Sequence, residues 1–209
     1  MLLIKSVNMG ILLVGFGKYL SYGYNPSWEM AKKFDKKTIS GAKVSGLVLT
    51  VEHREALKEL NERIREEKPD AIMALGLAPG RGYIALERVA QNRYFYIDTD
   101  VEADEPLYKD GKPVYYSTLP LQRIREKLRS NGIPSEYSFF ADTYLCNEVF
   151  YEIMDIAEKR RIKSAGFIHV PLTHVQIIKT KRFNSPSMDE STIEKAVRIA
   201  IEETCEALK

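Results

Sequence analysis

Short apolar runs alternate along the chain with longer segments in which apolar residues recur at helical spacing. The runs are almost continuously apolar, which is typical of strands buried on both faces of a parallel sheet. In the longer segments, leucine or isoleucine recurs every three to four residues between charged residues, which is the pattern of an amphipathic helix. Strands are predicted over residues 11–16, 44–51, 70–75, 136–141 and 164–170, and helices over residues 25–34, 52–68, 121–128, 144–158 and 191–208.

Capping and turn residues mark the ends of several predicted elements. Asn25 followed by Pro26 predicts a helix start, because Asn caps the first turn and Pro fits the first helical position. Ser191, with Glu194 three residues later, predicts a capping box at the start of the last helix. Residues 94–116 follow no regular pattern and are locally acidic, which predicts a surface loop.

This order of elements predicts an α/β fold with a largely parallel sheet, because strands alternate with helices of ten to fifteen residues. The chain has 209 residues and shows no internal repeat, no low-complexity segment and no linker. That length suits one domain, at roughly 150 residues per domain. Since Met9 directly precedes the first strand, residues 1–8 are predicted to be an extension ahead of a domain spanning residues 9–209.

Charge and composition exclude several classes of protein. The chain has 31 Lys and Arg against 29 Asp and Glu, a formal charge of +2, which argues against a general nucleic-acid binder. Two cysteines and three histidines make neither a disulfide framework nor a good zinc site. No stretch reaches the ~20 apolar residues that cross a membrane, and the N-terminus lacks signal-peptide features. The expected location is the cytoplasm.

Candidate chemistry lies at the predicted carboxyl ends of strands, where ligands gather in open α/β sheets. Glu87 follows the loop at 76–81, Cys146 lies near the start of a predicted helix, and His169 ends a predicted strand. A single cysteine with a distant histidine and an acid is the pattern of a thiol nucleophile. If Asp142 or Thr143 caps the helix, Cys146 lies in its first turn, where backbone N–H groups and the helix dipole favour a thiolate.

Each of these residues also has a purely structural interpretation. Free cysteines are among the most buried residues, so Cys146 could be a core residue. His169 could be a core histidine bonded to a backbone carbonyl, and Glu87 could form a surface ion pair with Arg88. The residues alone leave both interpretations open.

Four motifs, taken in order, resemble the pyrrolidone-carboxylate peptidase (pyroglutamyl peptidase type I) family. They are Gly-Leu-Ala-Pro-Gly-Arg at 76–81, Leu-Glu-Arg-Val-Ala-Gln-Asn at 86–92, Tyr-Leu-Cys-Asn at 144–147 and Gly-Phe-Ile-His-Val-Pro at 166–171. The resemblance runs from about Met9 to the C-terminus. It implies a single-domain, three-layer α/β/α sandwich of the phosphorylase/hydrolase-like type, with a mixed, largely parallel sheet. It also implies a cysteine peptidase that removes an N-terminal pyroglutamyl residue.

The resemblance also implies roles for individual residues. The family's nucleophile falls on Cys146, its histidine on His169 and its glutamate on Glu87. Its aromatic substrate-binding residues fall on Phe16 and on Tyr19, which stands where a second Phe is usual. The implied partners are N-terminally pyroglutamylated peptides, with no metal or cofactor, and the implied assembly is a homo-oligomer, commonly a tetramer.

Four positions depart from the family pattern. The first loop carries Lys18 and Tyr19, and Ile97 stands where an Arg is usual. Asp142 replaces the usual Gly, and its negative charge is expected to raise the pKa of a nearby thiol. Two alternatives therefore stay open: a relative that cleaves a different N-terminal cyclic or acyl amide, and a non-catalytic binding protein of the same fold.

Overall fold

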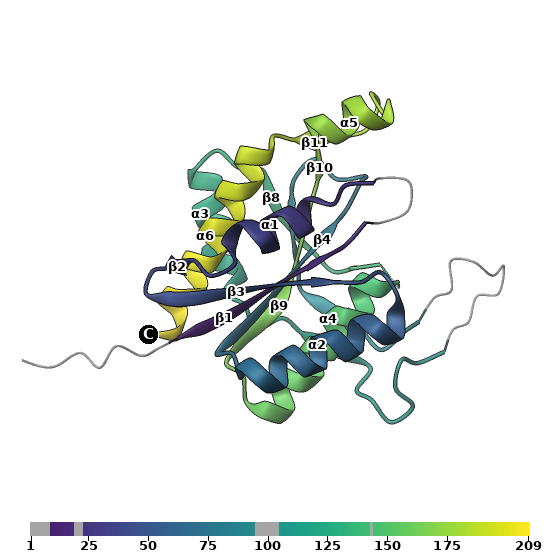
Figure 1. Ribbon diagram of the computed structural model, residues 1–209, viewed down its shortest axis with the longest axis vertical. Helices are drawn as coiled ribbons and strands as arrows, with labels where there is room; N and C mark the ends of the chain where they lie inside the picture. The colour runs from purple at the N-terminus through teal and green to yellow at the C-terminus, as the bar shows by residue number, and fades with distance from the viewer. Residues whose placement is uncertain (1–8, 19–22, 95–104, 143) are drawn as a thin grey trace, which may run out of the picture.

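The computed structural model describes residues 9–18, 23–94, 105–142 and 144–209, in which helices cover both faces of a seven-stranded sheet (Figure 1). The sheet strands are β1 (Gly10–Phe16), β2 (Thr38–Ile39), β3 (Ala42–Leu49), β4 (Ala71–Leu77), β5 (Ile84–Glu87), β8 (Ser135–Ser138) and β9 (Ser164–Val170). Two short pairs join β6 (Val89–Gln91) with β7 (Val114–Tyr116) and β10 (Leu172–Thr173) with β11 (Ser187–Met188). The helices are α1 (Pro26–Phe34), α2 (His53–Glu67), α3 (Leu121–Ser130), α4 (Leu145–Arg160), α5 (His174–Thr180) and α6 (Glu190–Leu208).

The sheet is mixed. Its strand order is β2-β3-β1-β4-β9-β5-β8, and the four strands β3, β1, β4 and β9 run parallel. The β5 strand runs antiparallel to β9 and parallel to β8, while β2 is antiparallel to β3. None of the described helices has the length and apolar character needed to span a bilayer.

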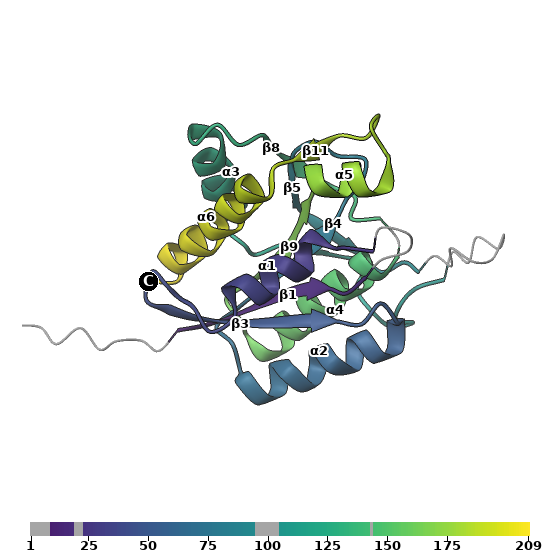
Figure 2. The same cartoon turned by 45° about the horizontal axis from the view of Figure 1, so that its top comes forward.

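Two apolar layers separate the sheet from its helices. Helices α1, α3 and α6 cover one face and α2 and α4 cover the other (Figures 1 and 2). Successive side chains of a strand point to opposite faces. In β1, therefore, Ile11 and Leu13 pack in the core cluster that includes the residues of α1 and α6, while Leu12 and Val14 pack with those of α2 and α4. This arrangement confirms the predicted three-layer α/β/α sandwich.

The predicted elements are largely confirmed, with one correction at the last helix and several short elements that were not predicted. Asn25 caps α1 as expected, its side chain accepting from the Ser27 N–H. The last helix, however, starts at Glu190, because Asp189 is its N-cap and accepts from the Ser191 N–H, so the predicted Ser191 capping box is wrong. The short strands β2, β5, β6, β7, β10 and β11 and helix α5 were not predicted, since elements of two to seven residues are too short to show a period. Of these, β7 lies within the stretch 94–116 that was predicted to be a loop.

Two glycines let α1 lie directly against the sheet. A Cβ on Gly15 would lie 2.3 Å from the Ser27 carbonyl oxygen, and one on Gly46 would lie 2.1 Å from the Ala31 carbonyl oxygen. Both obstacles are backbone atoms, which have little room to shift. The contact is also hydrogen-bonded, because the Phe16 N–H donates to the Ser27 hydroxyl at 3.1 Å. The close approach of α1 therefore fixes the end of β1, where Phe16 lies.

We expect Gly46→Ala to lower the free energy of unfolding by about 3 kcal/mol, the upper end of the usual cost of overpacking a core. The measurement is the urea concentration at half-unfolding. The matched control is Gly80→Ala, since a Cβ at Gly80 meets nothing within 4 Å. Equal midpoints for the two variants would contradict the close approach of α1.

Candidate active site

His169 lies near the carboxyl end of β9, between β4 and β5. The residue opposite it in β4 is Gly76, and a Cβ there would lie 2.9 Å from the His169 ring and 2.7 Å from the Phe167 ring. Gly76 thus leaves the space that the imidazole occupies. The residue opposite His169 in β5 is Ala85, which is also small.

Glu87 reaches His169 from the neighbouring strand. It lies two residues after Ala85 on the same face of β5, so it is the diagonal neighbour of His169, within reach of a long side chain. His169 Nδ1 and Glu87 Oε1 are 2.8 Å apart and hydrogen-bonded, and both side chains are buried. This bond occupies Nδ1, and Nε2 is the ring nitrogen that takes no part in it.

These contacts test the purely structural interpretations of Glu87 and His169. Glu87 does not pair with Arg88 on the surface, so that interpretation is wrong. The Arg88 guanidinium instead lies over the rings of Tyr137 and Phe139, at 5.0 and 5.6 Å from their centroids. His169 is buried as a core histidine would be, but its partner is a carboxylate and not a backbone carbonyl.

Arg81, which the sequence analysis did not single out, completes the surroundings of Glu87. Its Nη1 donates to Glu87 Oε1 at 2.6 Å, and its Nη2 donates to the Phe140 carbonyl at 3.0 Å. One carboxylate oxygen therefore serves both Arg81 and His169, while Oε2 is buried without a hydrogen-bond partner among the described residues. The sequence held a signal for this role of Arg81. A buried carboxylate needs a cation, and Arg81 ends the motif just before β5.

Cys146 is the second residue of α4. The N-cap of this helix is Tyr144, so the prediction that Asp142 caps it is wrong, and Thr143 lies outside the described residues. Cys146 still lies in the first turn, where backbone N–H groups lack intrahelical acceptors. The helical hydrogen bonds of α4 begin with the one from the Glu148 N–H to the Tyr144 carbonyl, at 3.1 Å.

Asn147 anchors the start of α4 to β6. Its side chain is fully buried, and its Oδ1 accepts from the Gln91 N–H at 2.9 Å. Its Nδ2 donates to the carbonyls of Gln91 and Arg93 at 2.8 and 3.2 Å. These three bonds fix the turn that carries Cys146 relative to the rest of the molecule.

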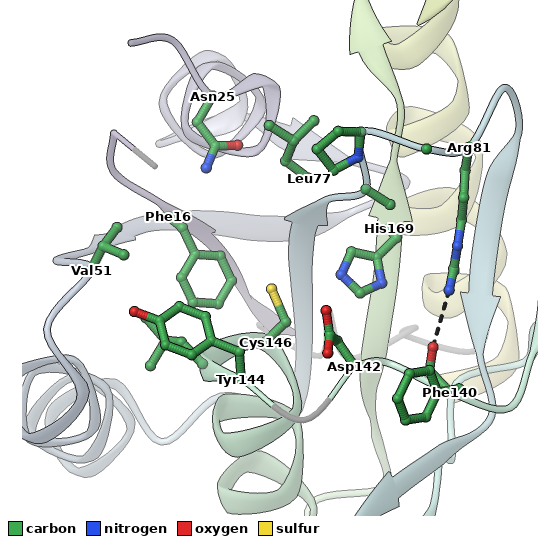
Figure 3. Close-up of a pocket in the computed structure, with 14 residues that line it drawn as sticks. Phe16, Asn25, Val51, Leu77, Arg81, Phe140, Asp142, Tyr144, Cys146 and His169 are labelled. Atoms are coloured by element: carbon green, nitrogen blue, oxygen red, sulfur yellow. Dashed lines mark hydrogen bonds between the residues drawn. The ribbon is translucent and has the colours of Figure 1, made fainter. Parts of the chain in front are cut away.

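Cys146 and His169 line one cavity, with a volume of about 430 Å³, which suits a small ligand (Figure 3). In Figure 3 the thiol and the imidazole lie next to each other, with Phe16 and Tyr144 beside the thiol, Asp142 below and between the two groups, and Phe140 at the end of Arg81. No group of three or more His, Cys, Asp or Glu within the described parts of the chain could hold a metal ion.

The aromatic wall of the cavity includes one of the two predicted substrate-binding residues. Phe16 lies at the end of β1 and lines the cavity, while Tyr19 lies outside the described residues. Tyr144, which was not predicted, adds a second ring. Its ring packs edge-on against His53, with centroids 4.8 Å apart, and His53 in turn pairs with Glu148 of α4. Its position two residues before Cys146 was the feature of the sequence that could have predicted Tyr144 to lie at the cavity.

The surroundings of Cys146 favour its neutral thiol. Burial raises its pKa to about 12, and the negative charges of Asp142 and Glu87 act in the same direction. The expected effect of Asp142 on the thiol is therefore confirmed in direction. A thiol with this pKa is almost entirely protonated at neutral pH, so it becomes a nucleophile when a neighbouring base removes its proton.

The chain is similar to known proteins over most of its length. The profile of the family described as Pyroglutamyl peptidase matches residues 9–207. The chain is 40% identical over 199 residues to the pyrrolidone-carboxylate peptidase of Bacillus mycoides, covering 92% of this chain and 91% of that protein. It is 36% identical over 202 residues to that of Halalkalibacterium halodurans, covering 92% and 98%. A solved structure of a mutant pyrrolidone carboxyl peptidase from Pyrococcus furiosus matches with a TM-score of 0.91 and 36% identity, covering 96% of this chain and 100% of that one.

The raised pKa of Cys146 predicts how the thiol reacts with iodoacetamide. In a Cys205→Ala background, the rate should rise with pH beyond about pH 9, because the thiolate is the reacting form. Asp142→Asn removes a charge that disfavours the thiolate, so the pKa falls and alkylation at pH 7.5 becomes roughly three- to tenfold faster, for half to one pKa unit. Asp110→Asn, which removes an exposed carboxylate that does not line the cavity, is the control. Equal rates for the two variants, or a rate independent of pH, would contradict this account.

Arg81→Met should destabilise the fold by about 3 kcal/mol, because it leaves the fully buried Glu87 without its cation. Arg81→Lys keeps the charge but loses the forked contact to Glu87 and Phe140, so its loss should be smaller. Thermal or urea unfolding measures both changes. If Arg81→Met unfolds at the same urea concentration as the parent chain, Arg81 does not compensate the Glu87 charge.

Proposed function

The chain belongs to the pyroglutamyl peptidase family, and on that premise we propose that it hydrolyses the amide bond after an N-terminal pyroglutamyl residue. Cys146 is the nucleophile, His169 is the general base and acid, and Glu87 orients the imidazole. The observation that carries this proposal is the buried hydrogen bond between Glu87 and His169 at the wall of the cavity that Cys146 lines.

In the first step His169 Nε2 takes the Cys146 proton, and the sulfur attacks the pyroglutamyl carbonyl carbon. Glu87, bonded to Nδ1, fixes the tautomer that leaves Nε2 free to accept and stabilises the imidazolium that forms. The carbonyl oxygen becomes an oxyanion. The N–H groups in the first turn of α4, which lack intrahelical acceptors, are the donors for it, and such donors are worth about 3–4 kcal/mol.

In the second step the tetrahedral intermediate collapses and the C–N bond breaks. His169 returns the proton to the leaving nitrogen, so the peptide departs as a neutral amine and the pyroglutamyl group remains as a thioester on Cys146. Water then attacks the thioester with His169 as base. Release of pyroglutamate restores the thiol, so the cycle needs no other reactant.

The shape and polarity of the cavity support a pyroglutamyl substrate. The lactam is small, flat and uncharged, and Phe16, Leu77 and Tyr144, which line the cavity, offer aromatic and aliphatic surface to it. From the same resemblance we expect Tyr19 to add to this surface. A homo-oligomer, commonly a tetramer in the family, and a cytoplasmic location are also expected from the resemblance.

The test is release of the chromophore from an L-pyroglutamyl amide. We expect Cys146→Ala and His169→Ala to lower kcat/KM at least about 10⁴-fold, as the loss of a nucleophile or its base does in such machinery. Glu87→Gln keeps the size of the side chain but removes its charge, and should cost about 10²- to 10⁴-fold.

Cys205→Ala is the matched control, since Cys205 is buried in α6 and its thiol contacts the Ile39 carbonyl, away from the cavity. This variant should retain activity. An inactive parent chain would refute the proposed substrate, while an active Cys146→Ala variant would refute the mechanism.

A further inference from the structure

His53 joins two residues that lie one turn apart at the start of α4. Its ring packs edge-on against the Tyr144 ring, with centroids 4.8 Å apart and ring planes at 83°. Its Nδ1 is hydrogen-bonded to Glu148 Oε2. Tyr144 is the N-cap of α4 and Glu148 follows it by four residues, so both side chains lie on one side of the helix. His53 is the first residue of α2, so it supports this side of α4 from the neighbouring helix (Figures 1 and 2).

Three contacts fix the orientation of the His53 ring. The Glu148 side chain is largely buried, and a buried carboxylate needs hydrogen-bond donors, which ties it to Nδ1. Nδ1 carries a hydrogen in one neutral tautomer and in the imidazolium, so the bond does not require a charged ring. The Tyr94 ring packs against His53 as well, with centroids 5.0 Å apart. The imidazole is thus held at one nitrogen and by two rings.

Tyr144 carries this support to the cavity. Its ring is partly exposed and lines the cavity beside Cys146, close to Phe16 (Figure 3). The step from the cavity to a substrate rests on the proposed function. With the pyroglutamyl carbonyl at Cys146, the lactam lies against the rings of Tyr144 and Phe16. Ordering a side chain on binding costs affinity, so a ring that is already held in place binds the lactam more tightly.

We infer that His53 is a positioning residue: held by Glu148, it fixes the Tyr144 ring in place as a wall of the pyroglutamyl pocket. An edge-on ring contact and an ordered side chain are each worth roughly three- to tenfold in affinity, so loss of the His53 ring should raise KM by about that factor. The value of kcat should change little, because the Tyr144 wall contacts the lactam in the ground state and in the transition state alike. His53 is not among the described residues that line the cavity, so it acts through Tyr144.

Three variants separate the ring of His53 from its hydrogen bond. His53→Asn keeps an N–H donor near the position of Nδ1 but removes the ring, so KM should rise. Glu148→Gln keeps both the His53 ring and an acceptor for Nδ1, so KM should stay near the parent value. Glu148→Ala removes the acceptor and should raise KM.

Asn61→Ala is the matched control. Asn61 lies about two turns further along α2 and donates to Glu152 of α4 at 2.7 Å, so its loss also weakens the contact between the two helices. Neither Asn61 nor Glu152 is among the described residues that line the cavity. Asn61→Ala should therefore lower the urea midpoint of unfolding, as His53→Asn does, and leave KM unchanged.

The first measurement is kcat and KM for release of the chromophore from an L-pyroglutamyl amide. The second needs no turnover: 2-pyrrolidone, the lactam ring alone, should protect Cys146 from iodoacetamide at about pH 9 in a Cys205→Ala background. The dependence of this protection on its concentration gives a Kd for the lactam. His53→Asn should raise this Kd by the same factor as KM, roughly three- to tenfold. In a Tyr144→Ala background, His53→Asn should change neither quantity, since the two residues act as one unit.

Unchanged KM and Kd in His53→Asn would overturn the inference, and so would an equal effect with and without the Tyr144 ring. A fall in kcat with KM unchanged would also contradict it. If the parent chain cleaves the amide while His53→Asn keeps the parent KM, the inference fails alone. If the parent chain does not cleave the amide, the proposed function fails, and the Kd of 2-pyrrolidone then decides: no protection, or the same Kd in both chains, overturns the inference.

Discussion

The buried Glu87 carboxylate accepts hydrogen bonds from both Arg81 and His169 through one oxygen, and the geometry of the site depends on this sharing. An ionised carboxylate without a cation would be costly to bury, so Arg81 makes the position tenable. Arg81 also donates to the Phe140 carbonyl, in the segment that leads to α4 and Cys146. One short network thus joins the histidine strand, the glutamate strand and the segment that precedes the cysteine.

The direction of β5 explains how the carboxylate enters this network. Phe16, Leu77 and His169 lie at or near the carboxyl ends of the parallel strands β1, β4 and β9, where ligands gather in α/β folds. Glu87 instead arrives on an antiparallel strand, opposite Phe167 and therefore under the imidazole and away from the cavity opening. The acid is buried behind the histidine, whereas the cysteine approaches it from a helix on one face of the sheet.

Much of this arrangement could be predicted from the sequence, and the same physical reasons explain which parts could not. Long apolar runs and amphipathic segments identify strands such as β1 and helices such as α2, because burial imposes their periodicity. The four residues of β5 are too few to show a periodicity, so its pairing with β9 was not evident. Local pattern gives Glu87 a neighbour in Arg88, and the true cation, Arg81, is chosen by a sheet register that is set by long-range pairing. Their positions at predicted strand ends and at a helix start made Cys146, His169 and Glu87 candidates, and the motif resemblance, not periodicity, implied the role of each.

The left-handed backbone at position 142 limits how the cavity's charge can evolve. Few side chains adopt a φ of 66° without strain, and Gly, Asn and Asp are the foremost among them. Of these three, Asp alone carries charge, and the resemblance gives Gly as the usual family residue. The backbone thereby restricts position 142 largely to two states, a charged Asp or a neutral Asn or Gly. A lineage could exchange one state for the other while the Glu87, His169 and Arg81 contacts stay as they are.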